Sequence, residues 1–242
     1  MPQPRLPDLR GYGASSKPSA GAGAVNYSKR AMALDVVEVM EELGFPTFRY
    51  AGHDRGARLG YRLALDHPQR VERVALLDVI PTIEQWEQMG WRGGLGGFHW
   101  FFLTQPSPLP ERMINADPEA FLRHLLESWS RTDSPFTAEA IAHYVAAFSD
   151  PDTVRATCDD YRAGAGIDSE FDASDREAGR RIEAPLLVLW GDQRGDRRRA
   201  MMETWERWAT NVEGLGLPCG HFLPEEAPEQ TLNALRTFFL KS

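Results

Sequence analysis

The 242-residue sequence has only two cysteines, no long apolar run and no excess of basic residues. Cys158 and Cys219 give neither a disulfide framework nor a metal-ligand spacing, which is typical of proteins of a reducing cytoplasm. No apolar stretch reaches the length of a membrane span, and the first thirty residues lack the hydrophobic region of a secretory signal. We therefore expect a cytoplasmic protein with two buried thiols, no metal site and no membrane partner.

Acidic residues outnumber basic ones, 35 against 27, and the formal net charge is −8. This balance argues against nucleic acid or an anionic membrane as the main partner. Hydrophobic residues make up 42% of the chain, which is enough for a sizeable core and excludes disorder. The run of three arginines at 197–199 is expected to be a solvated loop face.

Both ends of the chain alternate helical and strand patterns, which is typical of an α/β protein. Helices are expected over 27–43, 55–66, 201–208 and 229–240, and strands over 45–51, 71–80, 185–190 and 212–217. The region between them is rich in tryptophan, phenylalanine and helical pattern and has no strong strand. The sequence therefore predicts a core made of residues 1–82 and 179–242, with a helical cap inserted over residues 83–178.

One motif combines a strand, a sharp turn and a helix. Residues 50–58 read YAGHDRGAR, in which G-x-D-x-G has Asp54 at its centre. This pattern is typical of a nucleophile elbow with aspartate as the nucleophile. Gly52 and Gly56 are expected because side chains there would clash with the neighbouring strand and helix, and the backbone N–H of Arg55 is expected beside the carboxylate. The simpler interpretation is that Asp54 only caps the helix.

A carboxylate nucleophile forms an ester, and hydrolysis of that ester needs a base and an acid that orients it. His221, in a loop between the last expected strand and helix, is the best placed histidine, although it could be an ordinary loop residue. The acid often follows a later strand, three residues after a glycine, but here that position after Gly191 is Arg194. Asp78, at the end of the strand expected over 71–80, is therefore the candidate, unless it only forms a turn.

Six segments spread over almost the whole chain carry a narrower pattern. They are DLRGYG at 8–13, GHDRGAR at 52–58, LDVIPT at 77–82, FHW at 98–100, DYRAG at 160–164 and GHF at 220–222. Together they resemble the haloacetate dehalogenases, including the fluoroacetate dehalogenases, of the α/β-hydrolase superfamily. GHDxG alone is shared with haloalkane dehalogenases and epoxide hydrolases, but Arg55 and Arg58 with the cap motifs are more specific. The resemblance implies an α/β-hydrolase fold with a mostly parallel sheet and an inserted helical cap.

The resemblance also implies a reaction for the three catalytic candidates. Asp54 would displace halide from the α-carbon of a short 2-haloacid and form an aspartyl ester. His221, oriented by Asp78, would then activate water to cleave the ester. The expected products from haloacetate or fluoroacetate are glycolate and halide, with a small-molecule substrate, no metal and no organic cofactor. The similar enzymes imply a homodimer.

Two arginines match the pair that clamps the substrate carboxylate in the similar enzymes. Arg58 follows Asp54 by one helical turn, and Arg55 is its immediate neighbour. Arginine offers bidentate geometry to a planar carboxylate and offsets the repulsion between two anions. Solvated helix arginines are the simpler interpretation.

Three further residues match the donors that surround the departing halide: His99, Trp100 and Tyr161. Fluoride concentrates its charge, so N–H and O–H donors aimed at it in a dry pocket lower the barrier. Taken singly, the tryptophan and the tyrosine would more often belong to the core of the cap. Trp129 matches a pocket wall and is a candidate lining residue.

Two alternatives remain open. An epoxide hydrolase would use the same Asp54, Asp78 and His221 but needs two cap tyrosines, for which Tyr161 and Tyr144 could serve. The two arginines favour a carboxylate substrate instead. A non-catalytic remnant or binding protein is the second alternative, which the short N-terminus supports and the intact catalytic set opposes.

The N-terminus departs from the family pattern. Members of this family begin with several strands and a helix before the segment that corresponds to Asp8, including a His-Gly loop that supplies half of the oxyanion hole. Four strands with their connections would take roughly 50 residues. The resemblance therefore implies an N-terminally incomplete sheet, with an apolar edge at the strand 45–51. The missing oxyanion donor is expected to slow ester hydrolysis more than halide displacement.

Overall fold

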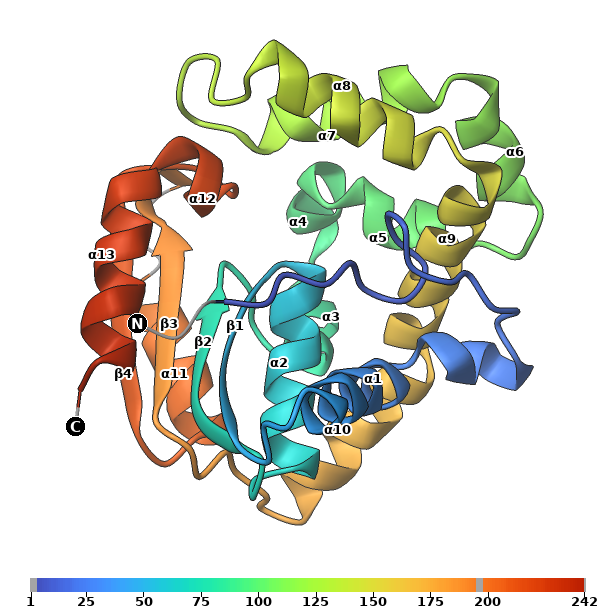
Figure 1. Cartoon of the computed structure of the whole chain (residues 1–242). Helices are drawn as coiled ribbons and strands as arrows, with labels where there is room; N and C mark the ends of the chain where they lie inside the picture. The colour runs from blue at the N-terminus through green and yellow to red at the C-terminus, as the bar shows by residue number, and fades with distance from the viewer. Residues whose placement is uncertain (1–3, 195–197, 242) are drawn as a thin grey trace.

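Four strands form one parallel sheet in the computed structural model, which describes residues 4–194 and 198–241 (Figure 1). The strands are β1 (Phe48–His53), β2 (Val71–Leu77), β3 (Leu186–Gly191) and β4 (Val212–Leu217). They are ordered β1-β2-β3-β4, and each neighbouring pair is parallel. Parallel pairing brings the carboxyl ends of all four strands to one edge, where the segments that follow them meet.

Helices cover both faces of this sheet because successive strand residues point to opposite sides. In β2, Val74 and Leu76 join one buried apolar cluster, whereas Ala75 and Leu77 join another. The first cluster contains residues of α1 (Lys29–Glu42), α2 (Arg55–Asp66) and α11 (Arg198–Trp208), and the second contains residues of α12 (Leu223–Glu226) and α13 (Pro228–Phe239). The two central strands are thus packed on both sides.

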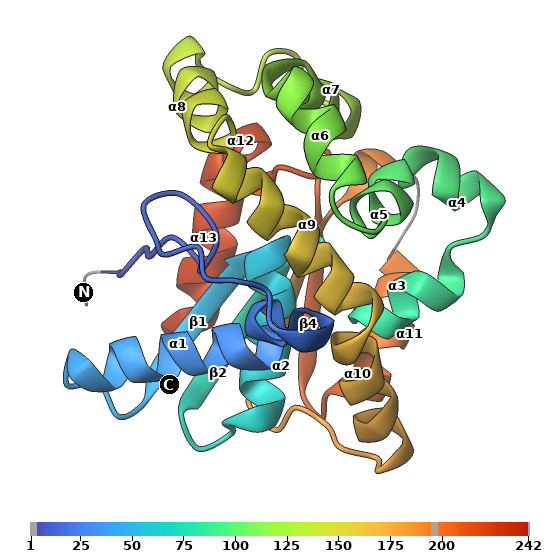
Figure 2. The ribbon, with the colours of Figure 1, turned by 90° about the vertical axis from the view of Figure 1, so that its right-hand side faces the viewer.

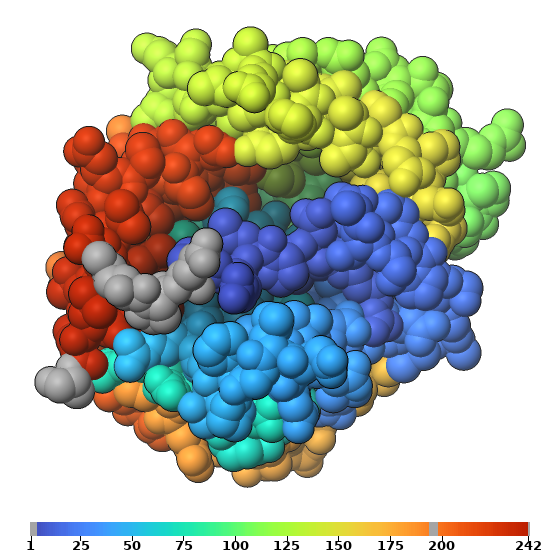
Figure 3. All heavy atoms as spheres, viewed as in Figure 1, coloured from blue at the N-terminus to red at the C-terminus, as the bar shows by residue number. Residues whose placement is uncertain are grey.

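A wholly helical segment separates β2 from β3, where the sequence predicts a cap. It contains α3 (Thr82–Gln88), α4 (Trp91–Gly96), α5 (Phe98–Leu103), α6 (Leu109–Ala116), α7 (Pro118–Trp129), α8 (Ala138–Phe148), α9 (Pro151–Ala165) and α10 (Ile167–Glu177). Helices α7 and α8 lie beyond the carboxyl ends of the strands (Figure 1), while α9 and α10 run back along the core beside the short helix η1 (Ala22–Tyr27) (Figure 2). Figure 3 shows a hollow in the surface between this segment and the N-terminal residues, which are dark blue. No described helix combines the length and hydrophobicity that a membrane crossing requires.

The helix expected over 55–66 and the strand expected over 212–217 have the predicted bounds, β3 is shifted by one residue from 185–190, and the two remaining strands differ more. The strand expected over 45–51 is β1, which begins later and ends later. It begins later because Pro46 has no N–H for the ladder, and it ends later because Gly52 and His53 still pair with β2. The second ends before Asp78, whose φ of 53° interrupts the extended backbone.

Helices α1 and α11 also begin two or three residues away from the expectation, and α13 begins one residue earlier. Helix α1 starts after Ser28, whose hydroxyl accepts a hydrogen bond from Ala31 N and so caps the helix. The short helix η2 (Asp192–Arg194) follows β3, and α11 begins at Arg198. Arg198 and Arg199 are exposed as predicted, but they belong to a helix rather than a loop, and Arg197 lies outside the described residues.

Strand β1 is an edge of the sheet. Among the described residues it pairs with β2 alone, and of its six residues only Phe48 is buried, whereas all of β3 is buried. An unpaired strand edge presents backbone N–H and C=O groups to any added strand. The edge that the sequence predicts beside the elbow is therefore present.

Expressed as these 242 residues, the protein is expected to self-associate through β1. Ala51→Lys places a charge at an exposed position in this strand and should reduce association, because an added strand would have to bury it. Light scattering across a concentration series measures the effect. Leu232→Lys adds the same charge to an exposed position of α13 and is the control. Equal reductions by the two variants would contradict edge pairing.

Candidate active site

Asp54 lies in the turn between β1 and α2, and its backbone is strained. Its φ of 45° and ψ of −112° belong to a region that L-residues rarely adopt. Although Asp54 occupies the N-cap position of α2, its side chain caps none of the described helix N–H groups. The interpretation as a simple helix cap is therefore wrong, and a strained turn whose carboxylate makes no bond to its own helix is the geometry of a nucleophile elbow.

Of the two glycines that flank this turn, only one needs to lack a side chain. A Cβ atom on Gly52 would lie 2.4 Å from the carbonyl carbon of Gly56, which is too close. A Cβ atom on Gly56 would meet Tyr50 Oη at 3.7 Å, an ordinary contact. The prediction of a clash at Gly56 is wrong, because this first turn of α2 leaves room for a methyl group there.

His221 lies between two carboxylates. Its Nδ1 is 2.7 Å from Asp78 Oδ2, and its Nε2 is 3.7 Å from Asp54 Oδ2. Asp78 is held at the end of β2, where its Oδ1 accepts a hydrogen bond of 3.3 Å from Gly191 N. The structure therefore brings together the three residues that the sequence predicts as nucleophile, base and orienting acid.

The charges in this group set its protonation before reaction. Burial disfavours the imidazolium, but Asp54 and Asp78 outweigh burial and raise the pKa of His221 to about 9. Burial would likewise raise the pKa of Asp54, yet His221 and then Arg55 hold that pKa well below its usual range. At neutral pH the carboxylate of Asp54 is therefore ionised, and His221 is a positively charged imidazolium.

Arg58 is buried one helical turn after Asp54. Its Nη1 donates a hydrogen bond of 3.1 Å to Ile80 O, and its guanidinium carbon lies 4.4 Å from the centre of the Trp100 ring. Its Nε is buried without a partner among the described residues. A buried unpaired donor is costly, so this edge of the guanidinium is suited to a ligand anion.

Arg55 extends toward the helical segment. Its Nε and Nη2 donate to Asp160 Oδ2 at 2.9 Å and Oδ1 at 2.6 Å, and its guanidinium carbon lies 4.2 Å from the centre of the Tyr161 ring. Neither arginine is a solvated surface residue, since Arg58 is 4% exposed and the Arg55 side chain is 11% exposed. Arg58 follows Asp54 by one helical turn and so shares its face of α2, and Arg55 is close enough for its charge to lower the pKa of Asp54.

Aromatic side chains from the helical segment complete this region. The His99 ring lies 4.6 Å from Trp129 and 5.7 Å from Tyr161, and Trp100 lies 5.5 Å from Tyr161, between ring centres. Trp129 also reaches His221, with 5.4 Å between their rings. Burial lowers the pKa of His99 to about 3, so the ring is neutral, and its Nδ1 is buried without a partner among the described residues.

His53 supports the histidine loop, a role the sequence did not suggest. Its Nε2 lies 2.7 Å from His221 O, and because a carbonyl oxygen only accepts, Nε2 must carry the proton. Burial lowers the pKa of His53 to about 4, which keeps the ring neutral. The position of His53 next to Asp54 in the GHD motif is the sequence feature that could have indicated this role.

Glu226 is a second supporting residue that the sequence did not reveal. Its Oε1 accepts from Phe222 N at 2.9 Å, and its Oε2 accepts from Gly220 N at 2.9 Å and from Arg131 N at 2.7 Å. These bonds join the loop of His221 to the chain that follows α7. The contact spans 95 positions in sequence, so no local pattern signals it.

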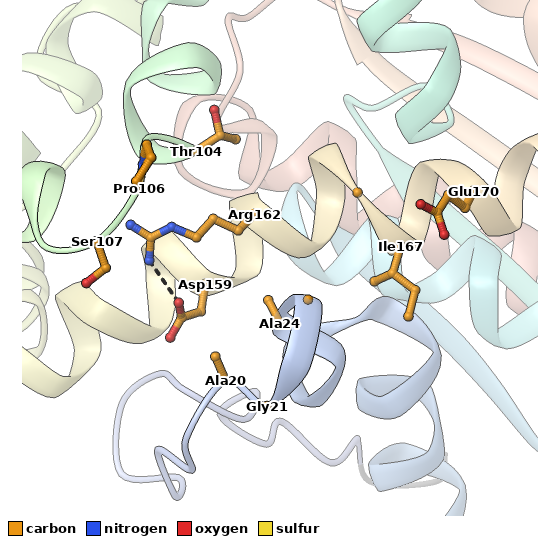
Figure 4. Close-up of a pocket in the computed structure, with 12 residues that line it drawn as sticks. Ala20, Gly21, Ala24, Thr104, Pro106, Ser107, Asp159, Arg162, Ile167 and Glu170 are labelled. Atoms are coloured by element: carbon orange, nitrogen blue, oxygen red, sulfur yellow. Dashed lines mark hydrogen bonds and ion pairs between the residues drawn. The ribbon is translucent and has the colours of Figure 1, made fainter.

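One depression in the described surface lies away from this group of residues. It has a volume of about 590 Å³ and lies between η1, α9 and the chain before α6, where Asp159 and Arg162 pair with each other (Figure 4). It contains none of the predicted site residues. Among residues 4–194 and 198–241, no three His, Cys, Asp or Glu side chains are grouped as metal ligands.

Comparison with known proteins identifies the family. The sequence model of the α/β-hydrolase fold matches residues 6–228. This chain belongs to the α/β-hydrolase family. The crystal structure of a Nostoc sp. PCC 7120 protein assigned to the α/β hydrolases is 49% identical and superposes with a TM-score of 0.93, covering 97% of this chain and 80% of that one. The fold class expected from the sequence is thereby confirmed.

Two curated relatives of this α/β hydrolase carry different activities. A fluoroacetate dehalogenase of Burkholderia sp. is 42% identical over 235 residues, which cover 96% of this chain and 76% of that protein. A soluble epoxide hydrolase of Corynebacterium sp. strain C12 is 35% identical over 239 residues, which cover 96% and 79%. The comparisons support a hydrolase, and the choice of reaction depends on the site.

Proposed function

We propose that this α/β hydrolase converts short 2-haloacids, such as haloacetate or fluoroacetate, to the 2-hydroxyacid and halide through an ester on Asp54. The observation that carries the proposal is the pair of buried arginines beside the nucleophile. An epoxide is uncharged and has no use for two cations, whereas a haloacetate brings a carboxylate that Arg58 Nε and its neighbours can bind. The similarity to a fluoroacetate dehalogenase supports the same choice.

In the first step, an oxygen of Asp54 attacks the α-carbon from the side opposite the halogen. A C–O bond forms as the C–halogen bond breaks, and the halogen leaves with the bonding electrons as halide. The lowered pKa of Asp54 keeps the nucleophile ionised for this step. The arginines hold the substrate carboxylate against the repulsion of the attacking carboxylate, which is the positioning that such a displacement needs.

In the second step, water cleaves the ester at the carbonyl carbon of Asp54. His221 Nε2 takes the proton of the attacking water, and the imidazolium so formed returns it to the alkoxide of the product as the alkoxide leaves. Esterification removes the negative charge of Asp54, which is one of the two charges that raise the pKa of His221 to about 9. The first step thus lowers the pKa of His221 and releases the base that the second step requires.

His99, Trp100 and Tyr161 are the proposed donors to the departing halide. Their rings lie within 5.5–6.2 Å of one another, between centres, in a buried part of the helical segment. Burial keeps His99 neutral, so it offers an N–H without adding a charge. Their burial excludes water, which strengthens their interaction with a small anion.

The position of Tyr144, the second tyrosine that an epoxide hydrolase would need, argues against the epoxide alternative. Tyr144 lies on α8, where its hydroxyl contacts Glu225 and its ring packs edge-on at 6.1 Å from Phe136. Tyr161, in contrast, packs against His99 and Trp100. The proposed second proton donor to an epoxide is therefore already bonded to a carboxylate.

Halide release from fluoro-, chloro- and bromoacetate, measured by ion chromatography, tests the proposal. We expect equal amounts of halide and glycolate with each substrate that turns over. Turnover of styrene oxide by folded protein, without halide release from any haloacetate, would instead establish the epoxide reaction.

Arg58→Lys should raise KM for chloroacetate roughly tenfold to a hundredfold. The substitution keeps the charge but removes the Nε–Nη2 edge, and a hydrogen bond to a charged group contributes about 1.5–3 kcal/mol. Initial rates across substrate concentrations measure the change. Arg49→Lys, on an exposed part of β1, is the control and should match the unaltered protein. An unchanged KM in Arg58→Lys would count against carboxylate binding at this residue.

A further inference from the structure

We propose that Asp160 is a positioning residue that fixes Arg55 so that only the Nη1 amino group of this arginine faces the substrate carboxylate. The inference rests on the proposed function for its substrate class. It assigns a role to a buried acid that the catalytic steps do not use. It also predicts that Arg55 and Arg58 bind the carboxylate in different ways.

The contact between Asp160 and Arg55 has fork geometry. Arg55 donates from Nε to Oδ2 at 2.9 Å and from Nη2 to Oδ1 at 2.6 Å, and Nη2 also lies 3.3 Å from Asp160 O. The fork uses one full edge of the guanidinium, and the Tyr161 ring lies 4.2 Å from its central carbon. Among the described residues, Nη1 of Arg55 has no acceptor. Only this group remains for a ligand.

The carboxylate of Asp160 is itself held firmly. Its side chain is fully buried, and both of its oxygens accept additional hydrogen bonds, from Lys29 Nζ to Oδ1 and from Tyr12 Oη to Oδ2 at 2.7 Å. Burial alone would raise its pKa, but Arg55 and Lys29 outweigh this and lower the pKa far below its usual range. An anion saturated in this way cannot follow a moving side chain, so it fixes Arg55.

The two arginines consequently differ in what they offer a substrate. Asp160 occupies the Nε–Nη2 edge of Arg55, whereas Arg58 Nε is buried and unpaired. Arg58 is therefore suited to bidentate binding through its Nε edge, and Arg55 to binding through Nη1 alone and to the final orientation of the carboxylate. Such orientation matters because displacement requires the α-carbon in line with Asp54.

A purely electrostatic role for Asp160 predicts the opposite effect from a positioning role. Removing its negative charge would increase the positive potential around Arg55 and tighten the binding of an anion. Loss of orientation would weaken that binding. The direction of the change in affinity therefore separates the two roles.

The test is the affinity of Asp160→Asn for glycolate, measured by titration calorimetry, which needs no turnover. We expect about tenfold weaker binding with an unchanged stoichiometry, because misfolded protein lowers the number of sites rather than the affinity of the remaining sites. Asp159→Asn is the matched control. It removes the neighbouring carboxylate of α9, which pairs with Arg155 and Arg162 and not with Arg55. The control should bind glycolate like the unaltered protein.

A double-mutant cycle then shows whether Asp160 acts through Arg55. In an Arg55→Lys background, which lacks the fork, Asp160→Asn should cause no further loss. If Asp160→Asn does not fold, Asp160→Glu keeps the charge beside Lys29 but shifts the carboxylate, and it should also weaken glycolate binding. Glycolate binding equal to or tighter than that of the unaltered protein in the folded variant overturns the proposal, as does an unaltered protein that binds no glycolate. Absence of halide release alongside the expected affinities rejects only the proposed reaction.

Discussion

Replacing His221 with asparagine should stop the reaction after the first halide is released. Displacement needs only the ionised Asp54, whereas ester hydrolysis needs a base at the position of His221 Nε2. We expect one equivalent of halide per site, followed by turnover reduced by a factor on the order of 10⁴ or more. Mass spectrometry after incubation with chloroacetate should show a carboxymethyl group on the peptide that contains Asp54.

Two controls accompany this experiment. His143→Asn changes an exposed histidine of α8, whose side chain is 78% exposed, and should turn over normally. Asp54→Ala in combination with His221→Asn should give neither halide nor adduct. An unmodified Asp54 in a His221→Asn protein that binds the substrate would rule out the covalent route.

The sequence predicted the arrangement of the three catalytic candidates better than it predicted the supporting contacts. Asp54, Asp78 and His221 each follow a strand, and parallel strands bring such positions to one edge of a sheet. Their proximity therefore follows from the order of elements. Gly52 also indicated the sharp turn before α2, since the close approach of α2 excludes a side chain at this position.

The supporting residues depend on contacts between distant parts of the chain. Lys29 and Asp160 are 131 positions apart, and their pairing is decided by how α9 packs beside η1 and α1. Neither residue belongs to a local pattern with the other. Glu226 is similar, because its partners on the chain after α7 come close only once the helical segment lies over the sheet.

Strand ends were misplaced where backbone geometry overrides apolar pattern. The strand before Asp78 continues as an apolar sequence into Val79 and Ile80, so pattern alone extends it. The positive φ of Asp78 ends it instead, and this same turn aims the carboxylate at His221 Nδ1. The local error and the functional geometry thus have one cause.

Replacing Asp78 with asparagine should slow ester hydrolysis by about 10⁴ while leaving halide displacement nearly intact, because an amide does not hold the imidazole in the tautomer that frees Nε2 to accept a proton. The pH profile should change as well. Asp78 and Asp54 raise the pKa of His221 to about 9, and in the ester only Asp78 keeps its charge. The base acts only after it has lost its proton. The rate of hydrolysis therefore rises with pH through the pKa that His221 has in the ester, which is lower than its pKa in the free protein. Removing the charge of Asp78 lowers the pKa and moves the rising limb to lower pH.

Rapid-quench measurement of the halide burst and of the following steady rate, repeated across pH, tests both effects of Asp78→Asn. Asp192→Asn is the matched control. The Asp192 carboxylate follows the neighbouring strand β3 and accepts a hydrogen bond of 2.6 Å from Trp190 Nε1. This substitution should change neither the rate of hydrolysis nor the pH at which the rate rises. A burst lost together with the steady rate would assign Asp78 to folding of the site. A rising limb that moves to higher pH would contradict the charge argument, because the removal of a neighbouring anion can only make the imidazolium a stronger acid.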